Sequence, residues 1–456
     1  MDARLALVPV RIVKAASAAT LVSLLCLAAP AQSQVLPRTG VAGQVPAAPI
    51  LGDNDDMDDQ SSGIAGLPGY PGRGLSLRAV AFSRYEDNLS RRVVPDDGLR
   101  LRANATASYG LGAGRFGLYA VGSYGRDEVI GNQRLDGANR VYFGGGVTAD
   151  LSRCTIDAGG SYRRNLVFMT DVIQFGSLEQ DTRQYGASAN CTIGSAISFS
   201  GSATRAEIGI LRGISTAIDS NRWTYTAGAA FSRPAFGRLS IDGSISDIDL
   251  TGRQVLTPTG LVDDGLLQRS VRLGLQRDFG SRISLTLGGS FLDTKPKISA
   301  NIVFVDGLPQ VVDRSSFSGA GYDAGLIFRL STRLSLTANG SRDIRANNFV
   351  GSQFQVVDLV EFGANYKLSN NFNFSAGYTY RNTRFRGAVI SALETVLRTQ
   401  DEFYRYYAHF GGKLGRRMNF GIDVIHNERR SNPSVFNFTS TGVGLTLGFE
   451  LGKQRS

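Results

Sequence analysis

The chain has 456 residues, a formal net charge of +10 and a sequence pI near 9.6. Its 55 Gly, 13 Pro and 19% charged residues exclude collagen, a Pro-rich linker protein and a disordered chain of low hydrophobicity. Beyond the N-terminus no uncharged apolar run reaches the roughly 18 to 20 residues of a membrane helix, which excludes a polytopic helical protein. With two His and three Cys, the composition predicts no metal site and no cofactor.

The first 31 residues have the pattern of a secretory signal peptide. Arg4, Arg11 and Lys14 form a positive region, an apolar core follows at 15–29, and small residues around Pro30 suit cleavage. A membrane anchor that stays attached is the alternative, but the apolar core is short for one. We therefore expect export from the cytoplasm.

Residues 32–74 form a Pro-, Gly- and Ala-rich stretch without apolar periodicity, which predicts a disordered periplasmic segment. It contains an acidic run, Asp53-Asn54-Asp55-Asp56-Met57-Asp58-Asp59. The run lacks the Gly and the closing Glu of a calcium-binding EF-hand loop, so a solvated charge run is the better interpretation.

From residue 75 to 456 the sequence predicts one all-β unit. Between Leu99 and Leu111 apolar residues alternate strictly with polar ones or Gly, which indicates a strand with one oily face. Soluble strands average about five or six residues, whereas a membrane-crossing strand needs about nine to eleven. The same alternation recurs at 116–124, 141–151, 223–231, 283–291, 372–380 and 443–451.

The connections between these segments come in two lengths. Short ones recur about every 40 residues, for example at 112–114 and 415–417. Long polar ones are expected at 86–98, 127–138, 166–182, 209–222, 250–266, 294–316, 345–353, 384–400 and 428–440. Short turns on one side and long loops on the other predict a transmembrane antiparallel up-and-down β-barrel of about 18 strands.

A β-propeller is the alternative architecture, because its blades also repeat about every 40 residues. Each repeat here holds two long strands rather than four short ones, and no blade signature recurs. Aromatic residues also gather at both ends of the oily faces, such as Tyr124 and Trp223 near the long loops and Phe116 and Phe449 near the short turns. Two such girdles favour the membrane barrel.

The last strand, Gly444 to Leu451, is similar to the C-terminal assembly signal of Gram-negative outer-membrane barrels, although it ends in Leu rather than an aromatic residue and is followed by five more residues. The resemblance covers 75–451. It implies location in the outer membrane, with lipid and the barrel assembly machinery as partners. A finer resemblance, to the "beta-barrel porin type 2" group, rests on Leu75 to Phe82 and on Tyr85-Glu86-Asp87-Asn88-Leu89. It implies exopolysaccharide export alongside periplasmic export components.

In a barrel the faces opposite the oily ones line the lumen. Seven acids share that face: Asp150, Asp157, Asp242, Asp323, Glu361, Asp423 and Glu450. Basic residues outnumber them, which favours anions such as acidic polysaccharides or small solutes. Ion pairing that merely braces the wall is the alternative, and Arg100 and Arg102 are the pair expected to remain unpaired. The candidate anion-binding residues are Arg78, Arg100, Arg102, Arg115, Arg163, Arg238, Arg272, Arg329, Lys367, Arg381, Arg405 and Lys413.

Cys154 and Cys191 fall at the short-turn end of one hairpin, both on the oily face. Opposed positions in the oxidising periplasm can form a disulfide, but a slip of one residue would separate them, so both outcomes stay open.

No enzyme is predicted. His409 faces the lumen and His426 the oily side, and neither has the Ser partner of an outer-membrane phospholipase. Nucleic acid is not an expected partner, because the positive charge lies inside an exported barrel.

Three functions fit this pattern. The first is an outer-membrane component of polysaccharide export. The second is a general or anion-selective porin, for which the apolar stretch Ile302 to Val305 in the 294–316 loop is the candidate lumen constriction. The third is a plugged barrel that binds or anchors a partner through its loops.

Overall fold

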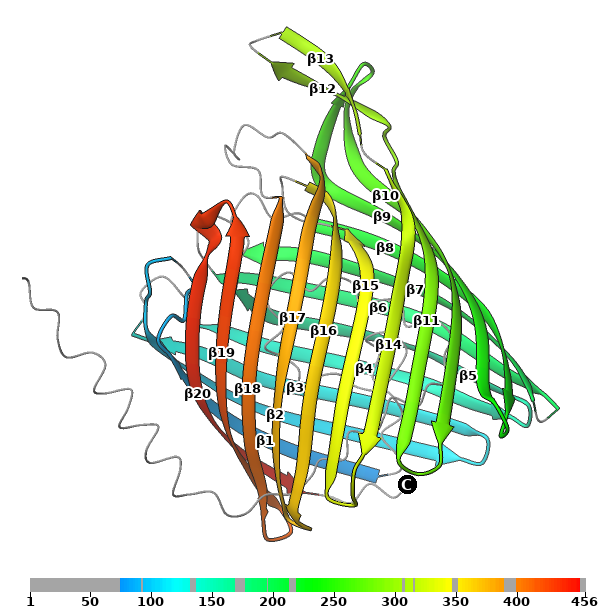
Figure 1. Ribbon diagram of the computed structural model, residues 1–456, viewed down its shortest axis with the longest axis vertical. Helices are drawn as coiled ribbons and strands as arrows, with labels where there is room; N and C mark the ends of the chain where they lie inside the picture. The colour runs from blue at the N-terminus through cyan, green and yellow to red at the C-terminus, as the bar shows by residue number, and fades with distance from the viewer. Residues whose placement is uncertain are drawn as a thin grey trace, which may run out of the picture.

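The chain folds as a single closed β-barrel (Figure 1). The computed structural model describes residues 74–451, apart from 92, 132–136, 169–176, 195, 213–218, 306–307, 315, 347–351 and 389–398. The predicted signal peptide and the predicted 32–74 segment lie outside the described residues, except for Gly74, which begins β1. The all-β prediction and the expected number of strands are confirmed, because one antiparallel sheet contains eighteen strands.

Eighteen strands form the barrel and two form a separate hairpin. Their bounds are β1 (Gly74–Glu86), β2 (Gly98–Ala113), β3 (Phe116–Ile130), β4 (Ala138–Leu151), β5 (Cys154–Phe168), β6 (Ser177–Ile193), β7 (Ile197–Arg212), β8 (Asp219–Arg233), β9 (Gly237–Thr257), β10 (Gly260–Phe279), β11 (Ile283–Pro296), β12 (Ala300–Val305), β13 (Leu308–Asp313), β14 (Phe317–Arg329), β15 (Leu334–Ala346), β16 (Ser352–Ser369), β17 (Phe372–Ala388), β18 (Gln400–Leu414), β19 (Met418–Asn432) and β20 (Phe438–Leu451), with a 3₁₀ turn, η2 (Ser434–Phe436), before β20.

The first strand closes the barrel. β1 pairs antiparallel with β2 on one side and with β20 on the other, where Leu77 lies opposite Leu451. Closure gives every strand two neighbours and leaves no edge, which a sheet in hydrocarbon requires. Within the described ranges, no helix is both long and apolar enough to cross a membrane.

The outer face carries the apolar residues of each alternation. Exposed side chains include Leu75 and Leu77 on β1, and Leu445 and Leu447 on β20. Tyr124, Tyr185, Trp223, Tyr225 and Tyr406 are exposed near one end, and Phe116 and Phe449 near the other. An aliphatic band between aromatic girdles suits the hydrocarbon and headgroup levels of a bilayer.

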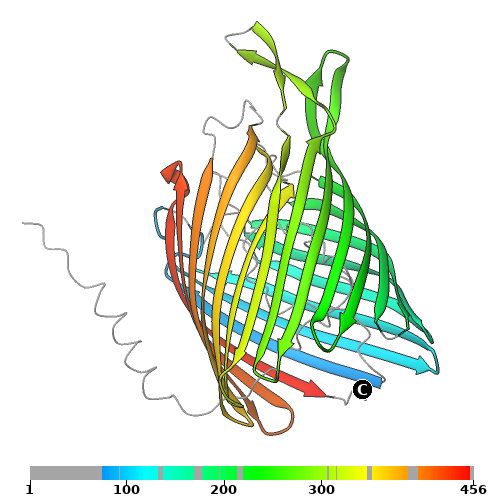
Figure 2. The ribbon, with the colours of Figure 1, turned by 45° about the vertical axis from the view of Figure 1, so that its right-hand side comes forward.

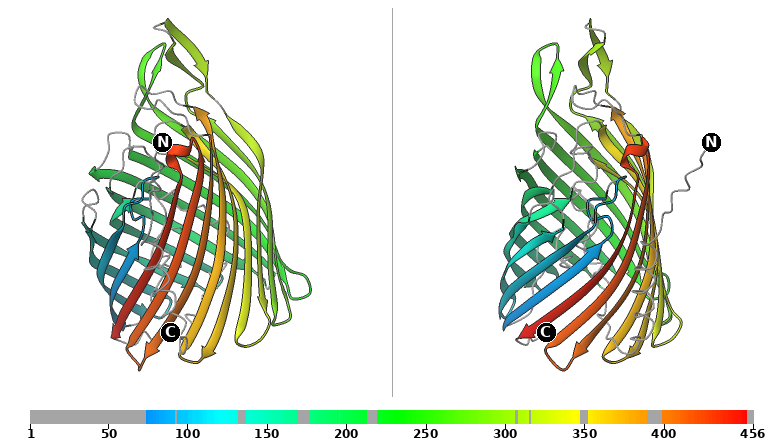
Figure 3. Two further views of the ribbon diagram at one scale, coloured as in Figure 1. Left: turned by 60° about the vertical axis from the view of Figure 1, so that its left-hand side comes forward. Right: turned by 90° about the vertical axis from the view of Figure 1, so that its left-hand side faces the viewer.

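The two ends of the barrel differ in their connections (Figure 3). At the turn end, hairpins such as β2–β3 and β18–β19 are joined by two or three residues, and Gly114 and Gly415 supply the positive φ that these turns need. β1 begins and β20 ends there as well. At the loop end the strands continue past the aromatic girdle into longer connections.

Two expectations about the long connections are wrong. Residues 250–266 are not a loop, because β9 and β10 extend and leave only Pro258 and Thr259 between them. Most of the 294–316 stretch is the hairpin β12–β13, which projects beyond the loop end instead of constricting the lumen (Figures 1 and 2). Strand pairing in both places satisfies backbone groups that would otherwise need water.

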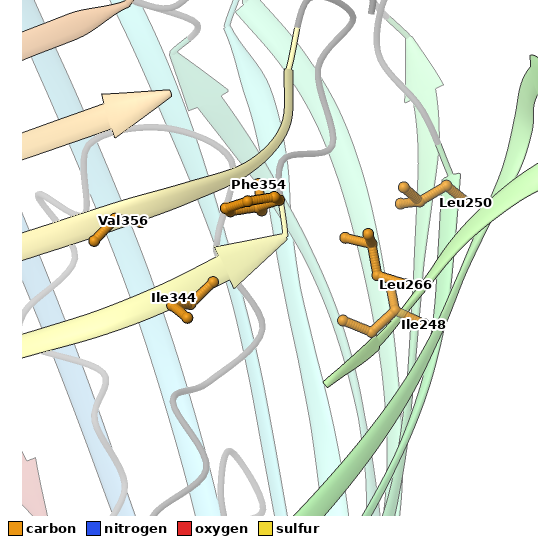
Figure 4. Packing of buried hydrophobic residues seen from close by; sticks show 6 residues of the cluster. All are labelled: Ile248, Leu250, Leu266, Ile344, Phe354 and Val356. Carbon is orange, nitrogen blue, oxygen red and sulfur yellow. The ribbon is translucent and has the colours of Figure 1, made fainter. Parts of the chain in front are cut away.

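A dry apolar cluster lies at the loop end. It joins two pairs of strands that are separated by β11 and β14 in the sheet: Ile248, Leu250 and Leu266 come from β9 and β10, and Ile344, Phe354 and Val356 from β15 and β16 (Figure 4). Leu292 and Phe317 from the two intervening strands pack against it. Side chains from the two pairs of strands therefore meet in this corner of the mouth.

Candidate functional site

The register places eleven of the twelve candidate basic residues on the lumen face, opposite in parity to the exposed apolar side chains. The exception is Arg115, which lies in the turn between β2 and β3, exposed at the turn end rather than on the lumen wall. A turn residue escapes the alternation of the strands that it joins, which explains this error.

Arg100 and Arg102 were expected to be unpaired, and this expectation is wrong. Asp127 on β3 lies directly opposite Arg102 and accepts hydrogen bonds from Arg102 Nε at 2.7 Å and Arg100 Nη2 at 3.0 Å. Arg140 Nη1 on β4 reaches the same carboxylate at 3.5 Å. Asp127 is fully buried, and Arg100 and Arg140 are nearly so. Three guanidinium groups around one carboxylate form a brace between three strands.

A second set of paired arginines lies on the lumen wall on both sides of the closure between β1 and β20. Arg84 on β1 donates to Asp423 on β19 at 3.0 Å, and Arg429 on β19 donates to Asp401 on β18. All four side chains are largely buried. These pairs join β1, β18 and β19 at the loop end.

One aromatic ring on β18 lies near two candidate arginines, one on the same strand and one on the neighbouring strand β17. Phe403 on β18 has the guanidinium carbon of Arg381 at 4.9 Å from its ring centre and that of Arg405 at 5.4 Å. Arg405 also donates to Asn427 at 2.9 Å. The Phe403 ring holds both guanidinium groups in place, and the amide oxygen of Asn427 also holds Arg405.

A third brace, at the mouth, centres on Asp264 of β10. Arg253 donates to it at 2.6 Å, and Arg314 donates to both of its oxygens at 2.6 and 2.8 Å. Arg253 also donates to the backbone oxygen of Ser352 at 3.2 Å. Asp264 therefore ties the β9–β10 hairpin to the segment before β14, and Arg253 ties the same hairpin to the start of β16.

The Asp264 carboxyl lies outside the membrane-spanning part of its strand. On β9, Asp247 pairs with Trp223 and so marks the level of the aromatic girdle. Asp264 pairs with Leu250, three residues beyond that level toward the loop end. Burial raises the pKa of Asp264, but hydrogen bonds from Arg314 and the charges of Arg253 and Arg314 outweigh burial. The pKa of Asp264 therefore lies below its ordinary value. It remains a carboxylate at neutral pH.

Farther from the mouth the lumen groups are more accessible. Arg272 donates to both oxygens of Asp323, at 2.7 and 2.6 Å, and lies 3.6 Å from Asp242. Arg163 stands over the ring of Tyr142 at 5.7 Å. The Arg272 side chain is 29% exposed, so it remains in contact with solvent while it binds the wall.

The remaining candidates lie toward the turn end. Lys367 and Lys413 are exposed, and Arg78 lies opposite Glu450 across the seam between β1 and β20. Arg329 donates to the backbone oxygen of Ser281 at 3.2 Å. Arg238 lies two residues into β9 on the lumen face. These five residues do not converge on one point but are spread around the opening.

Sequence reasoning missed five of the buried basic residues of the mouth. Arg84, Arg140, Arg253, Arg314 and Arg429 were not among the candidates, although all five take part in the braces. Arg253, Arg314 and Arg429 lie in stretches assigned to loops, and Arg84 and Arg140 lie two residues outside such stretches. Extending the strict alternation past the girdle would have placed Arg140 and Asp127 on the lumen face.

Cys154 and Cys191 are direct partners in the register of β5 and β6, and the structure records a disulfide between them. The bond lies on the outer face beside the turn end. It settles the register that the sequence left open.

His426 lies on the outer face, where Nδ1 is 2.9 Å from Thr441 Oγ1 and the ring lies beside Tyr406. His409 faces the lumen near Gly411 and Gly421. The described residues contain no group of three or more His, Cys, Asp or Glu placed to hold a metal ion.

No protein-family model and no curated protein matches the chain. Solved structures similar to it include the glucuronate complex of OccK2 (OpdF) from Pseudomonas aeruginosa, at 12% identity and TM-score 0.47, over 83% of this chain and 98% of that one. The alcaligin outer-membrane receptor FauA from Bordetella pertussis is similar at 12% identity and TM-score 0.45, over 84% of this chain and 77% of that one.

Proposed function

We propose that this protein is a channel of the Gram-negative outer membrane that passes an acidic polysaccharide, as a component of exopolysaccharide export. The observation that carries the proposal is the closed eighteen-strand barrel with an apolar exterior and arginines on its lumen wall. A barrel of this strand number encloses an aqueous lumen. Rings of Arg favour anions, and guanidinium groups bind carboxylates in bidentate fashion.

The accessible cations lie along the wall rather than in one pocket. Arg163 and Arg272 are partly exposed in the middle of the lumen, and Lys367 and Lys413 are exposed toward the turn end. A polymer with repeated carboxylates can exchange one such contact for the next, which suits conduction better than tight binding. The resemblance to the porin type 2 group supports the same proposal but has no support from the family models.

The decisive experiment is single-channel conductance of the refolded protein in a planar bilayer, with a salt gradient and with oligouronides as blockers. We expect a stable, anion-selective pore that oligouronides block and that neutral oligosaccharides of equal length do not. A pore indifferent to both would point to a small-solute porin. In cells, unchanged surface polysaccharide after gene deletion would contradict the export role.

A plugged or gated barrel is the second candidate, and the packing of the mouth favours it. The braces at Asp127 and Asp264 are buried, and apolar side chains of β9 and β10 pack with those of β15 and β16. Folded, heat-modifiable protein that shows no conductance would support this candidate over the open channel.

A further inference from the structure

The turn end carries a concentration of positive charge, of which the channel proposal uses only Lys367 and Lys413. We call the Lys and Arg side chains in or next to the short turns the basic rim. Among the described residues it comprises Arg115, Arg153, Arg233, Arg238, Arg277, Arg282, Arg329, Arg333, Lys367, Lys413, Arg416 and Arg417. The same stretches contain three carboxylates, Asp150, Asp278 and Glu450. The excess of twelve cations over three anions is nearly as large as the formal net charge of the whole chain, +10.

Most side chains of the basic rim are exposed, and only Arg238, Arg277 and Arg329 are half-buried. Arg282, Arg333, Arg416 and Arg417 are all exposed. Within the described part of the chain, the eleven rim side chains other than Arg238 form no ion pair with a carboxylate within 4.0 Å. Arg277 and Arg329 instead donate to the backbone oxygens of Ala235 and Ser281. These bonds hold the guanidinium groups at the turns without neutralising them.

A ring of like charges around one opening repels itself and attracts anions. Exposed charges separated by more than about 8 Å are largely screened at physiological salt, so a polyanion must lie close to several rim residues to gain from them. A short, dense acidic segment meets that requirement better than scattered single anions.

The chain itself contains such a segment. Its acidic run, Asp53 to Asp59, has five Asp in seven positions. Fourteen residues separate Asp59 from Gly74, where β1 begins. Gly74 lies opposite Gly110, close to the β2–β3 turn, so the tether starts at the basic rim. A chain of this length spans at most about 50 Å, and the run is thereby confined to the neighbourhood of the turn end.

We propose that the basic rim binds the acidic run Asp53 to Asp59 of the same chain, in competition with external polyanions. Tethering by a short segment raises the effective concentration of the run to about the millimolar range, so each contact can be weak. An incoming anionic polymer must displace the run.

The test compares two chains that both begin at Gln32: the unmodified chain, and one with Asp53, Asp55, Asp56, Asp58 and Asp59 all changed to Asn. A fluorescent peptide of residues 50–62 is titrated against each in vesicles of zwitterionic lipid, by anisotropy. We expect the peptide to bind the neutralised chain at least about tenfold more tightly, because the tethered run competes in the unmodified chain. The affinity should fall as salt rises.

Two further variants of the neutralised chain locate the site. The rim variant carries Arg333→Gln, Arg416→Gln and Arg417→Gln. The matched control carries Arg126→Gln, Arg183→Gln and Arg430→Gln, which remove three exposed charges from the outer face near the loop end. We expect the rim variant alone to weaken peptide binding, by about tenfold.

Three results would overturn the proposal: equal peptide affinity for the unmodified and neutralised chains, equal weakening by the rim and control variants, or no binding at physiological salt. Vesicles containing phosphatidylglycerol test lipid as the rival occupant. If that lipid abolishes the difference between the two chains, headgroups hold the rim and the acidic run does not. None of these readings depends on transport, so the channel proposal stands or fails separately.

Discussion

The two ends of the barrel use the same residue type in opposite ways. At the loop end, Arg100, Arg253 and Arg429 are buried, and each donates to a carboxylate. At the turn end, Arg333 and Arg417 are exposed, without a carboxylate partner among the described residues. Position relative to solvent, rather than residue identity, separates the two groups.

The difference follows from the cost of desolvating charge. A buried guanidinium without a partner loses several kcal/mol of hydration, so the mouth can hold arginines only with carboxylates beside them. An exposed guanidinium keeps its water and needs no partner. The loop-end arginines are therefore fixed parts of the wall, and the turn-end arginines remain available to anions.

The largest effect is expected at the Asp127 brace. Asp127→Asn leaves Arg100, Arg102 and Arg140 around a neutral side chain, and we expect a loss of about 3 to 5 kcal/mol in the free energy of unfolding. Urea unfolding of the refolded barrel, followed by heat-modifiability on gels, measures this loss.

The neighbouring residue provides the control. Glu128 is an exposed partner of Arg126 on the outer face, so Glu128→Gln should cost less than about 1 kcal/mol. Equal costs for the two substitutions would show that the loop-end pairs are not structural braces.

The Asp264 brace adds a dependence on pH. Its folded-state pKa lies below that of the unfolded chain, near 4, so its contribution is complete above about pH 4 and is lost as the pH falls through the folded value. At pH 7 we expect Asp264→Asn to cost about 3 kcal/mol. Unfolding measured at pH 7 and at successively lower pH should show this cost shrinking toward zero. A cost that does not change with pH would contradict the assignment.

At the turn end the corresponding covalent support is the disulfide between Cys154 and Cys191, 37 residues apart in sequence. Loop-closure entropy for that separation predicts about 3 to 4 kcal/mol, and residual structure in the unfolded chain lowers the gain to about 2 kcal/mol. The double substitution to Ser should lower stability by that amount. An unchanged midpoint in non-reducing urea would show that strand pairing alone fixes this hairpin.

The alternation in the sequence predicts the barrel and the lumen face of most candidates, because a period of two is a local property. It does not predict where a strand stops beyond the membrane. Asp127 was assigned to a loop for that reason, and without it Arg100 and Arg102 lacked a partner. The contact between Arg253 and Ser352, and the cluster that joins Leu266 to Phe354, depend on distant strands meeting across the mouth. No local pattern encodes such contacts.

The smallest effect on stability, and the clearest on ion selectivity, is expected at the basic rim. Arg416→Gln with Arg417→Gln removes two exposed, solvated charges, so the free energy of unfolding should change by less than about 0.5 kcal/mol. The ratio of anion to cation permeability should fall by about twofold at low salt, where rim charges are least screened.

The counterpart of the rim substitution is Arg100→Gln. It removes one charge from the buried Asp127 brace, where Arg102 and Arg140 still compensate the carboxylate. We expect it to lower stability and to leave selectivity unchanged in the fraction of protein that folds. The opposite result is that Arg100 controls selectivity and the rim pair controls stability. It would mean that permeating anions meet the loop-end wall, and that the turn end only holds the hairpins in place.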